Sequence, residues 1–151
     1  MRNGVAIKMR DIEIDFVVND CLAALKCYER IFEVERIEVT DLQKGQNEVI
    51  FSIYGTRFHM LDANPKFKLV APNPEHPITM WVNITVPDIK RTYKKAIEAG
   101  CIEVQPVVEL AGYGVSNASF MDPHGYHWML HQVHEVVSRE ERLKLWDKMK
   151  D

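Results

Sequence analysis

The sequence predicts an α+β fold built from two copies of a half-size unit, followed by one C-terminal helix. The first observation is a repeated order of elements: residues 11–32 contain an alternating strand, an aspartate and a helix, and residues 79–100 repeat that order. The second is that each half ends in a glycine followed by a strand, at Gly55 and at Gly125. Neither half buries its apolar face well alone, so we expect the two to form a cupped mixed sheet around a cleft.

The first half begins with a strand in which apolar side chains alternate with acidic ones, a period that favours one buried face. Asp20 is a candidate N-cap for the helix that follows, because its short side chain can accept a hydrogen bond from a free backbone N–H. The elements expected here are a strand at 11–18, a helix at 21–33 and strands at 47–54 and 57–62, within a module spanning residues 11–62.

The second half repeats the alternating strand, and Asp88 is the corresponding N-cap candidate. Gly100 stands where the C-terminus of a helix favours a left-handed residue. The elements expected here are a strand at 79–86, a helix at 89–99 and strands near 103–110, 115–121 and 127–132, within a module spanning residues 79–133.

The remaining segments connect and extend the modules. Residues 63–78 contain four of the seven prolines and predict a Pro-rich connector. Ser138 and Glu141 fit a capping box, which predicts a terminal helix at 138–150 that can pack on its own chain or across a dimer. The whole chain, residues 1–151, is expected to form a single domain.

Composition excludes several classes of protein. A net charge of −3 gives no electrostatic reason to expect nucleic acid or an anionic membrane as a partner, and no run approaches the ~20 apolar residues of a membrane helix. Three cysteines, an odd number, do not suggest a disulfide framework, so a reducing, cytoplasmic location is expected. Glycine-rich nucleotide loops and an esterase elbow are absent from the sequence.

Strand alternation assigns a set of polar residues to one face of each sheet. If the apolar side chains of each strand pack on the helices, the opposite side chains line the cleft. A mixture of apolar walls and a few directional polar groups is what a small-molecule site needs, although a solvated sheet face is polar as well. The candidate ligand-binding residues on this face are Glu13, Arg57, His59, Trp81, Asn83, Asn117, His127, Met129 and His131.

Four segments carry a resemblance to a known family. FMDPHGYHWMLHQ at residues 120–132, AGYG at 111–114 and VPDIKRTYKKAIEAG at 86–100 resemble the vicinal-oxygen-chelate superfamily of glyoxalase I, bleomycin-resistance proteins and extradiol dioxygenases. VSREERLKLW at 137–146 resembles its PhnB-like branch. The resemblance covers residues 11–146 and implies paired βαβββ modules around a cleft, and a homodimer.

The resemblance also implies a site for one divalent metal, with ligands from the first and last strands of each module. The corresponding positions are Glu13 and His59 in the first module, and Trp81 and Met129 in the second. Carboxylate and imidazole are good ligands for Zn²⁺, Mn²⁺, Fe²⁺ or Ni²⁺, whereas indole does not ligate usefully and thioether is a poor donor for these ions. Metal ligands are therefore expected only at Glu13 and His59, an incomplete site.

Three functions follow from these residues, and the sequence does not decide between them or whether the protein is an enzyme. The first is a domain that binds a small organic molecule without the complete metal site, with Trp81 as an aromatic wall. The alternative is a metal-dependent lyase, isomerase or dioxygenase acting on a vicinal-oxygen substrate, with His127 or His131 as third ligand or general base. The third is a dimeric scaffold whose cleft has no task. No substrate is identified.

Overall fold

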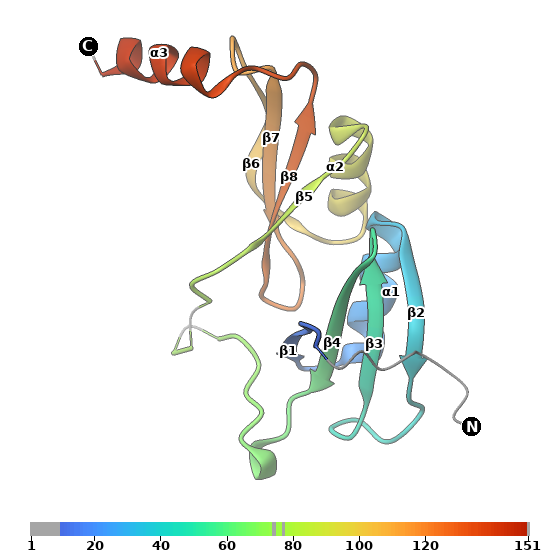
Figure 1. Ribbon diagram of the computed structural model, residues 1–151. Coiled ribbons are helices and arrows are strands. Elements are labelled where there is room, and N and C mark those ends of the chain that lie inside the picture. The colour runs from blue at the N-terminus through green and yellow to red at the C-terminus, as the bar shows by residue number, and fades with distance from the viewer. Residues whose placement is uncertain (1–9, 74, 77, 151) are drawn as a thin grey trace. The chain divides into compact units, whose positions relative to one another are not determined.

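The computed structural model describes residues 10–73, 75–76 and 78–150, and it contains two βαβββ modules followed by a helix (Figure 1). The α+β fold, the two modules and the C-terminal helix predicted from the sequence are confirmed. The chain divides into two compact units. One runs to Ile78 and includes Pro123–Gly125, and the other holds Thr79–Asp122 and the chain from Tyr126 onward. The cleft expected from the sequence stays a prediction.

The first module is a four-stranded mixed sheet with one helix against one face (Figure 1). The first strand pairs in parallel with the last, and the other neighbours are antiparallel. Phe51, Met60 and Tyr28 are fully buried between helix and sheet. The elements are β1 (Ile14–Val18), α1 (Cys21–Ile31), β2 (Val34–Val39), β3 (Glu48–Ile53) and β4 (Thr56–Asp62), in the sheet order β1-β4-β3-β2, with a short 3-10 helix at Pro65–Phe67 in the connector.

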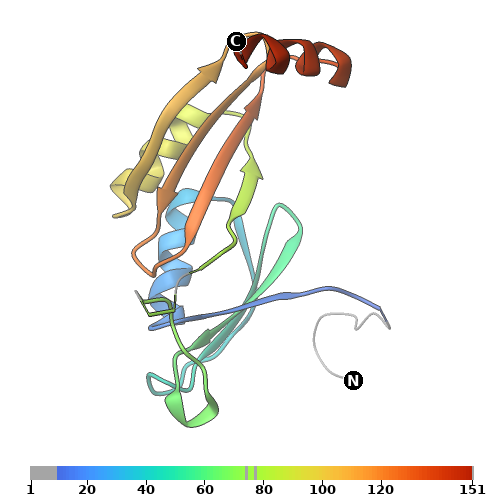
Figure 2. The same cartoon turned by 90° about the vertical axis from the view of Figure 1, so that its left-hand side faces the viewer.

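The second module repeats this arrangement, and α2 covers one face of its sheet (Figure 2). Phe120, Trp128 and Leu130 are buried on the helix side, as the alternation predicts. The elements are β5 (Val82–Thr85), α2 (Ile89–Glu98), β6 (Ile102–Leu110), β7 (Val115–Met121) and β8 (His127–Val133), in the sheet order β5-β8-β7-β6.

Each helix starts at the aspartate that the sequence predicts. Asp20 Oδ1 accepts a hydrogen bond from the backbone N–H of Ala23 at 3.0 Å, and Asp88 Oδ1 accepts one from Arg91 at 3.1 Å. These bonds satisfy N–H groups that the first turn of a helix leaves free. Both predicted N-caps are confirmed.

A second acceptor at each helix start comes from the last strand of the same module. Asp62, in β4, accepts a hydrogen bond from the N–H of Cys21 at 2.8 Å, and Gln132, in β8, accepts one from Ile89 at 2.9 Å. The two modules therefore share the same contact between the first residue of the helix and the last strand, with a carboxylate in one and an amide in the other.

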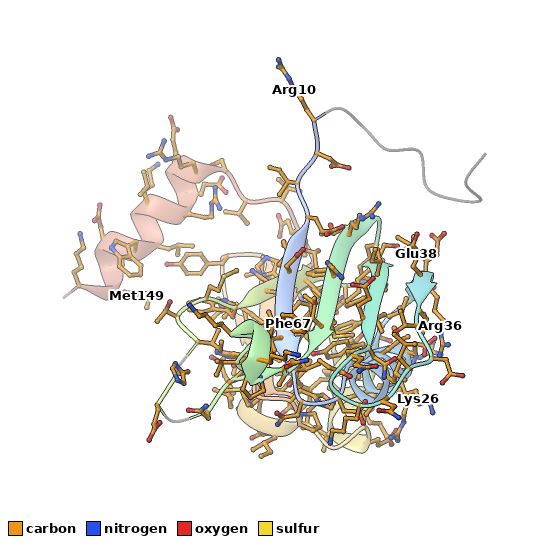
Figure 3. The ribbon with its side chains drawn as sticks, turned by 90° about the horizontal axis from the view of Figure 1, so that it is seen from below. Arg10, Lys26, Arg36, Glu38, Phe67 and Met149 are labelled. Carbon is orange, nitrogen blue, oxygen red and sulfur yellow. The ribbon has the colours of Figure 1, made fainter. Side chains whose placement is uncertain are left out.

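The first two strands differ from the expectation, and the sheet edge explains both. β1 begins at Ile14 rather than at residue 11, because this edge strand has only β4 as a partner and the ladder starts with Ile14 beside Phe58. β2 was not singled out from the sequence, since it is the other edge of the sheet and its charged side chains obscure the alternation. Arg36 and Glu38 on this strand are labelled in Figure 3.

The C-terminal helix α3 (Arg139–Met149) is capped by Ser138, whose Oγ accepts a hydrogen bond from the N–H of Glu141 at 3.2 Å. Leu143 and Trp146 are half exposed, and none of the described residues of α3 is buried. The helix contacts the β6–β7 turn through Leu145, which lies against Gly112. No described helix is long and apolar enough to span a membrane.

Candidate functional site

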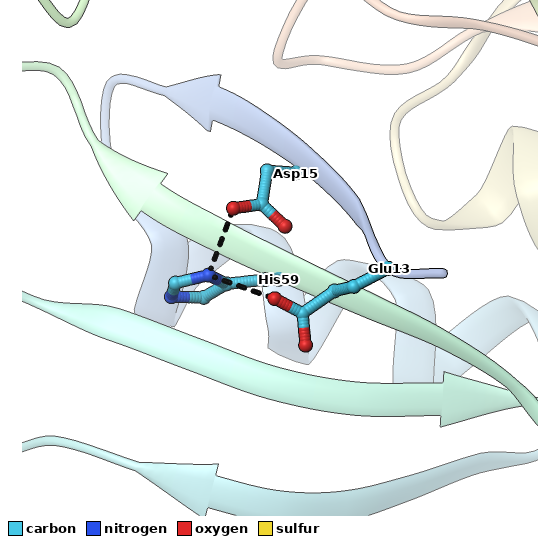
Figure 4. A group of neighbouring side chains, drawn as sticks. All are labelled: Glu13, Asp15 and His59. Atoms are coloured by element: carbon cyan, nitrogen blue, oxygen red, sulfur yellow. Dashed lines mark hydrogen bonds and ion pairs between the residues drawn. The ribbon is translucent and has the colours of Figure 1, made fainter. Parts of the chain in front are cut away.

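A histidine on the open face of the first sheet is surrounded by carboxylates. The parallel pairing of β1 with β4 puts Asp15 beside His59, and Glu13 lies two residues earlier on the same side. The Nδ1 atom of His59 lies 3.2 Å from Asp15 Oδ2 and 3.4 Å from Glu13 Oε1 (Figure 4). Its Nε2 atom lies 3.3 Å from Oε2 of Glu48 on β3. Both ring nitrogens therefore face a carboxylate.

Arg57, two residues before His59 on β4, adds a positive charge to this group. Its Nε donates a hydrogen bond to Glu13 Oε2 at 2.7 Å. Both side chains keep about a third of their surface in water, so the ion pair contributes at most about 1 kcal/mol. The Glu13 carboxylate thus has one oxygen on the guanidinium and the other beside His59.

The cluster of Glu13, Asp15 and His59 has the donor chemistry of a metal site. Each offers one ligand atom, and these atoms lie within 4.8 Å of one another. Carboxylate oxygens and imidazole nitrogen suit Mn²⁺, Fe²⁺, Ni²⁺ and Zn²⁺. An ion that used both oxygens of Glu13 would have to displace Arg57. The donors are present, but they are already engaged with one another.

The same positions of the second sheet hold different chemistry. β5 pairs with β8 in parallel, with Asn83 beside Met129 as Asp15 is beside His59. Trp81 precedes Asn83 by two residues, as Glu13 precedes Asp15. An indole, an amide and a thioether thus stand where the first sheet has two carboxylates and an imidazole.

Trp81 forms a pair with His127, a second candidate residue of this face. The ring centroids are 5.6 Å apart and the planes are inclined by 37°. The indole is 53% exposed, whereas the Nε2 atom of His127 is buried and has no hydrogen-bond partner among the described residues. A buried polar atom without a partner destabilises the fold by about 1–3 kcal/mol, which a bound polar group would recover.

Asn117 and His131 form the other pair on this face. Asn117 Oδ1 lies 2.6 Å from His131 Nδ1, and the two residues are opposite each other in the β7–β8 ladder. Met129 is opposite Ser119 in the same ladder. The open face of the second sheet therefore carries an indole, two imidazoles, two amides and a thioether, with no carboxylate among the candidates.

Sequence reasoning missed two contacts near these residues. Glu48 was not assigned to the site, although it lies two residues from Ile50, the β3 partner of His59, so alternation alone could have placed it there. Ser116 and His134 were also missed: Ser116 Oγ lies 2.7 Å from His134 Nε2. No motif marks that second pair, and Ser116 is buried on the helix side of β7.

Comparison with models of protein families assigns the chain to a superfamily. The family model of the Glyoxalase/Bleomycin resistance protein/Dioxygenase superfamily matches residues 12–130. The chain belongs to this superfamily. The superfamily resemblance predicted from the sequence is therefore confirmed. A search of curated proteins finds no match.

Solved structures of the same fold cover nearly the whole chain. A mutant of the fosfomycin resistance protein FosX from Listeria monocytogenes, complexed with Mn(II) and 1S,2S-dihydroxypropylphosphonic acid, has a TM-score of 0.64 at 15% identity, over 93% of this chain and 99% of its own. TioX from Micromonospora sp. ML1 has a TM-score of 0.60 at 13% identity, over 85% and 100%. A putative 3-demethylubiquinone-9 3-methyltransferase, PhnB protein, from Bacillus cereus has a TM-score of 0.62 at 14% identity. The match covers 82% of this chain and 100% of the Bacillus cereus chain.

The superfamily resemblance assigns metal ligands to four positions, and the residues at these positions differ in how well they can bind a divalent ion. Of the four positions, Glu13 and His59 carry donors, and with Asp15 their ligand atoms lie within 4.8 Å of one another. Trp81 has no lone pair to offer, and Met129 offers only a thioether.

Proposed function

We propose that this glyoxalase/bleomycin-resistance-like protein binds a small organic molecule on the open faces of its sheets, without the complete metal site of its superfamily. The proposal is supported by Trp81 and Met129, which stand at two positions that the superfamily resemblance assigns to metal ligands, and by the bond between Glu13 and Arg57. A polar, part-buried face with an exposed indole is suited to hold a ligand by stacking and hydrogen bonds.

The second sheet supplies the groups for such a ligand. The exposed indole of Trp81 offers a flat surface for an aromatic or conjugated ring. The Nε2 atom of His127 lacks a partner, and the Asn117–His131 pair adds an amide and an imidazole. These groups favour a planar molecule that carries oxygens able to donate or accept hydrogen bonds. Asn83 and Met129 would form the floor between them.

A tryptophan comparison tests this proposal. Catechol and 4-hydroxybenzoate serve as planar, oxygen-bearing probes, and intrinsic fluorescence quenching measures their binding. We expect saturable quenching that Trp81→Phe abolishes. Trp146→Phe is the matched control, because Trp146 is 55% exposed and Trp81 is 53% exposed. Equal quenching in the two variants would contradict a site at Trp81.

A metal-dependent lyase, isomerase or dioxygenase is the second candidate, and the cluster of Glu13, Asp15 and His59 favours it. Asp15 would then supply a third donor in place of those missing from the second module. Bound divalent metal would polarise a substrate with two neighbouring oxygens. The complex of the FosX mutant with Mn(II) is consistent with this candidate for the fold in general.

Thermal unfolding separates the two candidates. Chelator-stripped protein is titrated with Mn²⁺, Fe²⁺, Ni²⁺ and Zn²⁺, beside His59→Ala and the control His76→Ala, an exposed connector histidine. A metal at 100 times its dissociation constant adds about 2.7 kcal/mol of stability. A rise in melting temperature lost only in His59→Ala supports the enzyme, whereas no rise supports the metal-free binding domain.

A homodimer is part of the proposal, on the superfamily resemblance. Half-exposed Leu143 and Trp146 on α3 are available apolar surface for such a contact. Sedimentation equilibrium measures the mass directly: 17.5 kDa for a monomer, or twice that value for the dimer.

A further inference from the structure

Two methionines flank His127 on the open face of the second sheet. Met121 is the β7 partner of His127, at the end of the ladder beside the β7–β8 turn. Met129 follows His127 by two residues on β8, so the alternation of side chains puts it on the same face. Phe120 and Trp128, one residue away on each strand, are buried on the helix side. Two thioethers and an imidazole therefore share one part-buried patch of the open face.

The ladder brings these three side chains within reach of a common point. Residues directly opposite each other in an antiparallel pair have Cβ atoms about 5 Å apart, which applies to Met121 and His127. Met129 lies about 6–7 Å further along the strand than His127. A methionine side chain is unbranched and flexible, so each sulfur atom can turn toward the imidazole without a change in the backbone.

The imidazole of His127 has a nitrogen suited to complete such a group. Its Nε2 atom is withdrawn from water, and among the described residues it is the one buried side-chain nitrogen or oxygen without a hydrogen bond. A neutral imidazole carries a proton on one nitrogen and a free lone pair on the other. When the proton is on Nδ1, the buried Nε2 offers a bare lone pair, which is the form in which histidine binds a metal ion. The unpartnered atom therefore points to a ligand that accepts an electron pair.

Trp81 adds an aromatic surface beside this nitrogen. Its ring centroid is 5.6 Å from that of His127. Trp81 directly precedes β5, whose ladder with β8 starts at Val82, so no strand pairing holds the indole in place. Tryptophan is the side chain that attracts a cation most strongly over its ring face, within about 6 Å of the centroid. An ion held by His127 would thus have an indole available to cover it.

The chemistry of these donors selects one class of ion. Thioether sulfur is a soft ligand that favours Cu⁺ and the similar ion Ag⁺, and it binds Mn²⁺ or Zn²⁺ poorly. Both thioethers and the imidazole are neutral, and the candidate residues of this face include no carboxylate that would attract a hard divalent ion. The cluster of Glu13, Asp15 and His59 on the first sheet has the opposite preference, because two of its three donors are carboxylates.

We propose that Met121, His127 and Met129 bind one soft monovalent ion, Cu⁺ or Ag⁺, with the indole of Trp81 over it. Two thioether sulfurs and the Nε2 atom of His127 are the ligands, and all three come from the β7–β8 hairpin. This site shares three residues with the organic-ligand site proposed above, but it requires neither that ligand nor any residue of the first sheet.

Methionine methyl NMR tests the site one sulfur at a time. The protein is labelled with methyl-¹³C methionine, and Ag⁺ is the first probe because it does not change its oxidation state in chloride-free buffer. We expect one equivalent of Ag⁺ to shift the methyl signals of Met121 and Met129. The signals of Met60, which is fully buried, and of Met149, which is 70% exposed, should stay in place. Excess Zn²⁺ should not reverse the shift of Met121.

Variants separate this site from the three buried cysteines, whose thiols also bind soft ions. Met121→Leu and Met129→Leu keep the apolar volume, and each should weaken Ag⁺ binding at least about tenfold, since even residues that only orient ligands contribute that much. Met149→Leu is the matched control and should change nothing. Anaerobic competition with the Cu⁺ chelator bathocuproine disulfonate measures the same order of affinities for Cu⁺.

Two results would overturn the proposal. One is binding of Ag⁺ that leaves the Met121 and Met129 signals in place or survives both substitutions with equal affinity, because the ion would then be held by the cysteines. The other is the absence of any response to Ag⁺. If catechol still quenches the native chain and not Trp81→Phe in that case, the organic-ligand site stands and only the soft-ion site fails.

Discussion

Replacing Asp62 should destabilise the first module more than replacing Gln132, its counterpart at the helix start, destabilises the second. Asp62 is 2% exposed, and its carboxylate accepts hydrogen bonds from the backbone N–H groups of Cys21, Gly45 and Asn47 at 2.8, 2.9 and 3.1 Å. The residue thus joins the start of α1 to the β2–β3 loop. Asp62→Ala would leave three N–H groups without their acceptor.

The magnitude follows from the number of bonds. At roughly 1 kcal/mol of net stability for each hydrogen bond, the loss for Asp62→Ala is about 3 kcal/mol. The matched control is Gln132→Ala, since Gln132 holds the corresponding helix start by accepting a hydrogen bond from the N–H of Ile89 at 2.9 Å. That change should lower stability by about 1 kcal/mol.

Urea unfolding followed by far-UV circular dichroism measures both variants. Circular dichroism is the suitable signal, because Trp81, Trp128 and Trp146 all belong to the second unit and tryptophan fluorescence would not report on the first. If Asp62→Ala lowers the free energy of unfolding no more than Gln132→Ala does, the three N–H groups find water in the folded protein and the reasoning fails.

The contribution of Asp62 also depends on pH. Burial opposes its charge, but the N–H donors led by Cys21 outweigh burial and hold the pKa of Asp62 below its ordinary value. A carboxyl with a lower pKa in the folded state stabilises the fold above its unfolded pKa, near 4, and this contribution is lost as the pH falls through the folded value. The stability difference between the native chain and Asp62→Asn should stay constant from neutral pH to about pH 5 and shrink below about pH 4.

Two further predictions concern the second module. Gly114→Ala should destabilise the chain by more than about 2 kcal/mol, because Gly114 has φ of 69° and an added Cβ would collide with the Glu135 carbonyl. The control is Gly55→Ala in the same urea assay. Gly55 has φ of 81° and nothing within 4 Å of an added Cβ, so its substitution measures the cost of the positive φ alone. Tyr93→Phe removes the hydrogen bond from the Tyr93 hydroxyl to the Glu103 carboxylate, with a loss of about 1 kcal/mol or less at this exposed position. Burial and that carboxylate raise the pKa of Tyr93, and burial also raises the pKa of Tyr54. An ultraviolet titration should therefore contain one fewer tyrosine that ionises above the ordinary range in Tyr93→Phe than in the native chain.

The repeated elements were legible in the sequence because local rules produce them. Asp20 and Asp88 cap their helices through residues three positions later, so the contact is contained in a few consecutive residues. The faces of β4 and β8 follow from the alternation of side chains along a single strand. His59 could thus be assigned to the open face of the first sheet, and Trp128 to the helix-covered face of the second, without knowledge of the partner strands.

Contacts across strands were not legible in the same way. Arg57 and Glu13 are 44 residues apart, and they form an ion pair only because β1 lies beside β4. Glu48 reaches His59 through the antiparallel register of β3 on β4. Strand order and register are settled by the packing of the whole sheet, which the composition of one strand does not encode.

The sequence by itself determined the superfamily, the two modules, the helix starts and which side chains leave the helix-covered face. Short-range periodicity and capping are sufficient for all of these. Only the tertiary structure decided that Glu13 is already bonded to Arg57, and that His127 keeps a buried nitrogen without a partner among the described residues. The reason is physical: these features depend on distances between residues far apart in the chain, and those distances exist only once the sheets have formed.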